Sequence, residues 1–92
     1  LAVCVAFGAN SAKEAFERGS AAGNQGNFQE AIKHYTQAIR IDPNYANAYN
    51  NRAAAYTVLS DLKSAAKDAK KACELGDCNG LQYLEANNLL SN

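Results

Sequence analysis

The sequence predicts an all-α fold in which antiparallel helix pairs stack into an α-α superhelix, a solenoid. Three observations predict it: a pattern that returns after 34 residues, apolar residues at helical spacing, and start and stop signals between the helices. The repeated positions include Ala12 and Ala46, Arg18 and Arg52, Ala31 and Ala65, and Ala38 and Ala72. A fixed period of this length is typical of stacked helical units.

Helices are expected at about residues 12–24, 28–41, 45–59, 62–75 and 80–90. The first follows the start signal Ser11-x-x-Glu14 and stops at Gly26. A short polar side chain three residues before Glu or Gln can satisfy the free N–H groups of a helix start. Gly26 suits a helix end because glycine adopts the left-handed backbone that ends many helices.

The later helices carry similar signals. The second helix has the apolar spacing i, i+3, i+4, i+7 of an amphipathic helix. It is expected to begin at Asn27-x-x-Glu30 and to end at the turn 42–44, after which the third helix starts. Asp61 is the expected N-cap of the fourth helix, and Gly76 ends it. Asn79-x-x-Gln82 is the expected start of the fifth.

The predicted core combines small residues with rings and leucine. Alanine and glycine let helix backbones approach closely, and the larger side chains fill the space between them. The residues expected to be buried are Ala31, Tyr35, Tyr49, Ala53, Tyr56, Leu62, Ala65 and Ala72.

The stretch from Asn24 to Tyr56 (NQGNFQEAIKHYTQAIRIDPNYANAYNNRAAAY) resembles the tetratricopeptide repeat, a helix–turn–helix unit. The resemblance implies a domain over 12–92, with repeats at 12–45 and 46–79 and a solvating helix at 80–90. The second repeat departs from the pattern at Ser60, Ala69 and Asp77, which stand where Gly26, Tyr35 and Pro43 stand one repeat earlier.

In this family the first helix of each repeat lines a concave groove. The resemblance therefore implies a protein–protein interaction module that binds a peptide or protein segment, with no enzymatic activity. Primary amides donate to and accept from a peptide backbone, which favours binding of extended or helical segments. The expected groove residues are Lys13, Phe16, Ser20, Asn24, Asn47, Asn50, Asn51, Ala54 and Thr57.

One subgroup of the family binds a terminal carboxylate with a clamp of cations and asparagines. Asn51 matches a clamp asparagine, but Phe16 and Ser20 replace other clamp residues. Leu81 and Glu85 stand where the third-repeat cations would be. A carboxylate ligand is therefore not expected.

The alternative function is a structural module that forms a homo-oligomer. Copies of the chain would join through the repeat ends and the apolar N-terminal arm. Two repeats and a cap fall below the roughly three repeats that usually give independent stability. This alternative stays open beside the peptide-binding prediction.

Residues 1–11 form an apolar arm that resembles the end of a secretory signal peptide. Periplasmic or secreted export is therefore expected, with no transmembrane segment in the mature chain and a cytoplasmic location as the alternative. Export would place Cys73 and Cys78 in an oxidising compartment, where a disulfide between them would tie the second repeat to the cap helix. Two unpaired cysteines are the other interpretation.

Composition argues against several other functions. The net charge is +0, whereas a nucleic-acid binder normally shows a basic excess. Lys63, Lys67, Lys70 and Lys71 share a helix face, which is interpreted as a solvated outer surface rather than an anion-binding patch. The single histidine, His34, has no arrangement of catalytic partners in the sequence, and neither a cofactor motif nor a metal-ligand spacing occurs.

Overall fold

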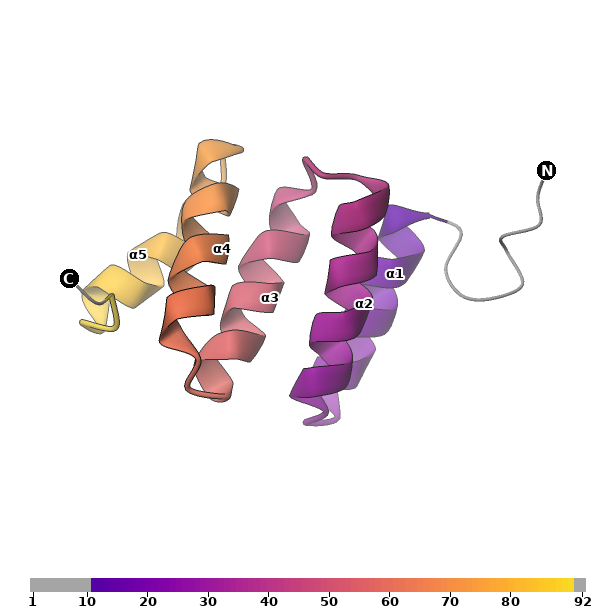
Figure 1. The fold of residues 1–92 in the computed structure, drawn as a ribbon, viewed down its shortest axis with the longest axis horizontal. Coiled ribbons are helices and arrows are strands. Elements are labelled where there is room, and N and C mark those ends of the chain that lie inside the picture. The colour runs from indigo at the N-terminus through magenta and orange to yellow at the C-terminus, as the bar shows by residue number, and fades with distance from the viewer. Residues whose placement is uncertain (1–10, 91–92) are drawn as a thin grey trace.

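A computed structural model of the protein describes residues 11–90, which fold into α-helices joined by short turns (Figure 1). The helices are α1 (Ala12–Asn24), α2 (Phe28–Ile41), α3 (Ala46–Val58), α4 (Leu62–Glu74) and α5 (Asn79–Ala86). The predicted arm, residues 1–11, lies outside the described residues except for Ser11.

The helices succeed one another along the molecule, as Figure 1 shows from α1 to α5. α1 packs against α2 and α3 against α4, and α2 contacts α3 to join the two pairs. α5 lies against both α4 and α3. The predicted all-α fold of stacked antiparallel pairs is confirmed for the described residues, although α5 ends at Ala86 rather than near residue 90.

Alanine dominates the buried core. Ala15, Ala38, Ala48, Ala65, Ala69 and Ala72 are all completely inaccessible to solvent, at 0% exposed. Six of the predicted core residues are buried: Ala31, Tyr35, Tyr49, Ala53, Ala65 and Ala72. The prediction was wrong for Tyr56 and Leu62, which are only partly buried. Tyr56 packs at the edge of the cluster around Leu84, and Leu62 is the first residue of α4, next to an exposed turn.

Two of the predicted start signals work as expected. The Ser11 side chain accepts a hydrogen bond from the Glu14 N–H, and the Asp61 side chain accepts one from the Ser64 N–H. The other two form no side-chain cap. Asn27 is the N-cap of α2, as predicted, but its side chain makes no cap hydrogen bond, and its own N–H donates to the Ala22 carbonyl.

The predicted start at Asn79 was wrong. Asn79 is already helical, and the Asp77 carboxylate accepts a hydrogen bond from its N–H at 3.1 Å. The acceptor that serves the start of α5 therefore lies two residues earlier than the sequence pattern placed it.

Four helix ends share one backbone conformation. Gly26, Ser60, Gly76 and Asn88 follow α1, α3, α4 and α5 with φ angles of 84°, 64°, 108° and 55°. In each turn the next N–H reaches back to a carbonyl of the preceding helix, as from Asp61 to Tyr56 at 2.9 Å. This is the Schellman arrangement, in which glycine fits without strain and serine does not. α2 ends differently, with an extended Asp42 before Pro43.

The close approach of α1 and α2 can be tested at two glycines of α1. A Cβ on Gly19 would lie 2.6 Å from a carbon of the Tyr35 ring, whereas a Cβ on Gly23 would make an ordinary 3.9 Å contact with Ala31. We expect Gly19→Ala to lower the free energy of unfolding by about 1–3 kcal/mol through overpacking. Gly23→Ala should raise it by about 0.5–1 kcal/mol, because alanine favours the helix. Urea denaturation of both variants measures the difference, and equal stabilities would contradict this packing.

The left-handed turn after α3 supplies a second test. Ser60→Gly should raise the free energy of unfolding by about 0.5–1 kcal/mol, since glycine relieves the positive φ. The reverse change at the equivalent turn, Gly26→Ser, should lower it by about 1 kcal/mol. Thermal denaturation checks both variants. A loss of stability in Ser60→Gly would show that the serine is not strained.

Candidate functional site

The first-helix side of the repeats holds two cavities that share part of α3. The α3–α5 cavity has a volume of about 420 Å³ and is lined by Asn47, Asn50, Asn51, Ala53, Ala54, Thr57, Asp77, Asn79, Gly80, Tyr83 and Leu84. The α1–α3 cavity has a volume of about 300 Å³ and is lined by Ser20, Gly23, Asn24, Phe28, Ala31, Tyr35, Asn51, Ala54 and Ala55.

The predicted groove residues are therefore divided between two hollows. All five from α3 line the α3–α5 cavity, and Ser20 and Asn24 line the α1–α3 cavity. Asn51 and Ala54 belong to both cavities and form the ridge between them. Lys13 and Phe16 line neither cavity.

Phe16 takes part in helix packing. Its ring centroid lies 5.7 Å from that of Tyr35 and 5.1 Å from that of Tyr45, in tilted arrangements. Such distances are typical of stabilising aromatic pairs. Phe16 therefore joins α1 to α2 and to the turn before α3, while Lys13 is an exposed residue on α1.

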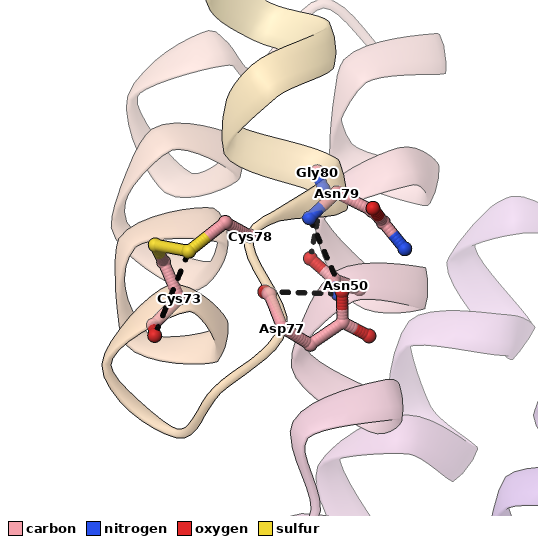
Figure 2. The surroundings of a disulfide bond; sticks show 6 residues. All are labelled: Asn50, Cys73, Asp77, Cys78, Asn79 and Gly80. Atoms are coloured by element: carbon pink, nitrogen blue, oxygen red, sulfur yellow. Dashed lines mark hydrogen bonds between the residues drawn. A yellow bond between two sulfur atoms is a disulfide. The ribbon is translucent and has the colours of Figure 1, made fainter.

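The Asn50 amide is used within the chain. Its Nδ2 donates to the Asp77 carbonyl at 3.3 Å, and its Oδ1 accepts from the Gly80 N–H at 3.2 Å (Figure 2). Both halves of the amide are therefore occupied by the segment that begins α5. Asn50 positions one wall of the cavity and is not free to bind a ligand in this arrangement.

Asn47 and Asn51 of α3 are open to a ligand, as are the exposed amides of Asn24 and Asn79 that line the same cavities. Asn47 is exposed, and its side chain makes no hydrogen bond within residues 11–90. Asn51 Nδ2 makes a long contact of 3.5 Å with Tyr35 Oη, which also lies 3.2 Å from Ser20 Oγ. The side-chain oxygen of Asn51, Oδ1, has no hydrogen-bond partner among the described residues. The cavities thus offer a full amide at the rim and an acceptor on the ridge.

The wall contributed by α5 was not predicted. The 34-residue register placed Leu81 and Glu85 on this face, but the cavity is lined by Gly80, Tyr83 and Leu84. Tyr83 is 57% exposed and offers its ring to the cavity. The turn after α4 has no proline and differs from the turn after α2, so the repeat register does not carry over to α5.

On the opposite side of α3, Arg52 forms a polar link that the sequence reasoning missed. Its guanidinium makes a two-point contact with Asp68 of α4, at 2.7 and 2.8 Å, and donates to Thr36 Oγ1 of α2 at 3.0 Å. The hydrogen bond to Asp68 raises the pKa of Arg52 above its usual value, partly offset by burial. Its carbon Cζ also lies 5.8 Å from the Tyr49 ring centroid. Arg52 therefore holds α2, α3 and α4 together behind the cavities.

In the structure a disulfide joins Cys73, in the last turn of α4, to Cys78, the N-cap of α5 (Figure 2). Its formation in the oxidised protein stays a prediction that thiol counting under denaturing conditions tests. The Cys78 sulfur also lies 3.7 Å from the Cys73 carbonyl oxygen. This contact is a weak hydrogen bond only in the reduced form, because a disulfide sulfur has no proton to donate.

Residues 11–90 contain no cluster of three or more side chains suited to holding a metal ion. In the same residues no helix is long and apolar enough to cross a membrane. His34 lies on α2 with its Nε2 3.6 Å from a Glu30 carboxylate oxygen.

Comparison with known proteins places the chain among repeat proteins. A family model described as a TPR repeat matches residues 23–57. Hsp70-Hsp90 organizing protein 1 of Glycine max is 46% identical over 69 residues, which are 75% of this chain and 12% of that protein. Hsp70-Hsp90 organizing protein 3 of Arabidopsis thaliana is 44% identical with the same coverage. Tetratricopeptide repeat protein 36 of Danio rerio is 35% identical over 69 residues, 75% of this chain and 37% of that protein. The chain therefore corresponds to a small part of each plant relative.

The Arg52–Asp68 pair leads to a stability prediction. Asp68→Ala should lower the free energy of unfolding by about 3 kcal/mol, because it leaves a largely buried guanidinium charge without its partner. The double variant Arg52→Met/Asp68→Ala should recover part of that loss, since it removes the charge as well. Urea denaturation compares them. Equal stability of the single and double variants would contradict the coupling.

Proposed function

Because this chain is a tetratricopeptide-repeat protein, we propose that it binds an uncharged segment of a partner protein along the α1–α3 and α3–α5 cavities. The observation that carries the proposal is the open amides beside the two cavities, above all Asn47 and Asn51 of α3. An amide beside an apolar hollow can bond a peptide backbone while a side chain fills the hollow.

The shape of the site favours an extended segment. Asn51 and Ala54 line both cavities, so a ligand that crosses this ridge reaches both. Ala54 is exposed and small, which leaves the ridge low. Tyr83 supplies apolar surface on the α5 side, and Phe28 supplies it in the α1–α3 cavity.

The charge of the site favours an uncharged ligand segment. The two cavities are lined by a single charged residue, Asp77, and by no lysine or arginine. A ligand carboxylate would therefore lose hydration without gaining an ion pair. The plant relatives are named for organising Hsp70 and Hsp90, and we extend to this chain the joining of protein partners. We do not extend a carboxylate-recognition mode to it.

A second candidate function, self-assembly of copies, is favoured by apolar side chains exposed at helix ends. Val58 and Leu59 are 57% and 41% exposed beside the turn after α3, and Ile41 is 45% exposed at the end of α2. Sedimentation analysis over a range of protein concentrations separates the two candidates. A monomer that binds peptide supports the first, and an oligomer that Val58→Asp dissociates supports the second.

The peptide site is tested with a peptide selected from a random display library on the purified protein. Ala54→Arg should weaken its binding at least about tenfold, because the long charged side chain blocks the ridge without a partner for its charge. Asn51→Ala should weaken it about fivefold through the loss of one hydrogen bond. Calorimetric titration measures each affinity.

The matched control is Ala21→Arg, the same change at an exposed position of α1 that lines neither cavity. Its affinity for the selected peptide should equal that of the unaltered protein. Selected peptides that bind Ala54→Arg as tightly as the unaltered protein would place the site elsewhere.

A further inference from the structure

α5 is held in place by tertiary contacts rather than by its own stability. It has eight residues, and isolated helices shorter than about 12–15 residues are marginal in water. Leu84 is its one buried residue, and its N-cap, Cys78, makes no side-chain cap hydrogen bond. The position of α5 therefore depends on the packing of Leu84 against Ala53, Ala65 and Ala69 and on the contacts that hold its first residues to the helices beside it.

Besides the turn hydrogen bond from the Asp77 N–H to the Ala72 carbonyl at 2.9 Å, two side-chain links hold that start, one to each neighbouring helix. The Asn50 amide ties Asp77 and Gly80 to α3 through two hydrogen bonds (Figure 2). The Cys73–Cys78 bond ties the same segment to the last turn of α4. Because these cysteines are 5 residues apart and the two side-chain links meet around Asp77, the bond also limits how far the partners of Asn50 can move.

The same segment forms one wall of the α3–α5 cavity. That wall consists of Asp77, Asn79, Gly80, Tyr83 and Leu84, and the opposite wall comes from α3. A shift of α5 away from α3 would widen this cavity and move the amide acceptor of Asn50 off the Gly80 N–H. The α1–α3 cavity has no residue after Ala55 in its lining, so it would keep its shape.

We propose that the Cys73–Cys78 pair is a redox switch that sets how firmly α5 is held against α3, and with it the peptide affinity of the α3–α5 cavity. The statement about affinity rests on the proposed function, whereas the statement about α5 does not. Both cysteines are partly exposed, which lets a small dithiol reach the bond.

The reduction is an ordinary thiol–disulfide exchange. One thiolate of a dithiol attacks a cysteine sulfur, forms a mixed disulfide and releases the other cysteine as a thiolate, which takes up a proton. The second thiol of the reductant then displaces the protein sulfur. One S–S bond breaks in the protein and one forms in the reductant, and two electrons pass to Cys73 and Cys78. The reduced Cys78 thiol keeps only its weak contact with the Cys73 carbonyl.

Hydrogen exchange of the α5 amides tests the switch without any ligand. The protein carries the substitution Cys4→Ser, so that Cys73 and Cys78 are its two remaining cysteines. Dithiothreitol should speed exchange in α5 about tenfold or more relative to the oxidised protein, because the cross-link no longer restricts local opening. Exchange in α1 and α2 should not change. Equal α5 exchange in the oxidised and reduced protein would overturn the proposal.

The matched control is Cys73→Ser/Cys78→Ser in the same background. Its α5 exchange should equal that of the reduced protein and should not respond to dithiothreitol. A response of the double variant to the reductant would also overturn the proposal, since it would assign the effect to something other than the bond.

The library-selected peptide extends the test to the cavity. Its affinity should fall about tenfold on reduction of the Cys4→Ser protein and stay constant in the double variant. If reduction speeds hydrogen exchange in α5 but leaves the peptide affinity unchanged, the statement about the cavity is overturned. Failure of the proposed function shows separately, as a peptide affinity that Ala54→Arg leaves unchanged, and the exchange result still decides the switch.

Discussion

The short distance between neighbouring helices is the constraint on which the rest of this structure depends. Buried alanines, among them Ala38, Ala48 and Ala65, supply contact without bulk. At Gly19 even a methyl group would meet the Tyr35 ring. Because the helix backbones lie this close, dispersion contacts along each helix are numerous, and a single added atom lowers the stability of the packing. The Asn50 amide of α3 reaches the turn before α5 for the same reason.

α3 converts that packing into a site, since it contacts each of the other four described helices. One side of it carries Arg52, whose guanidinium donates three hydrogen bonds to Asp68 and Thr36. The other side carries the asparagines, of which Asn50 is engaged and Asn47 is not. The polar groups of this helix thus divide between those that fix its position and those that remain for a partner. That division depends on what the facing helices offer, and helix spacing alone does not reveal it.

The parts of the structure that repeat were predictable, and the parts that occur once were not. The helix positions and the alanine core could be predicted from the 34-residue period, because the same pattern occurs in both repeats. Arg52 was recognised as a repeated residue, but its partner was not, since His34 occupies the position of Asp68 in the first repeat. The face of α5 was misjudged because its preceding turn has no second copy. Asn27 and Asn79 show that this start motif can lie at a helix start without forming its side-chain hydrogen bond.

The contact between Gly80 and Asn50 has a consequence for how this sequence can change over evolutionary time. A side chain at position 80 would collide with the amide oxygen of Asn50, which is the acceptor for the Gly80 N–H. The two positions are 30 residues apart in the chain, yet neither can be altered alone without loss. Related sequences that keep this arrangement should therefore show covariation: a larger residue at position 80 should accompany a smaller one at position 50. The residue at each of these two positions thus limits which substitutions the other tolerates, although neither position belongs to the repeated pattern.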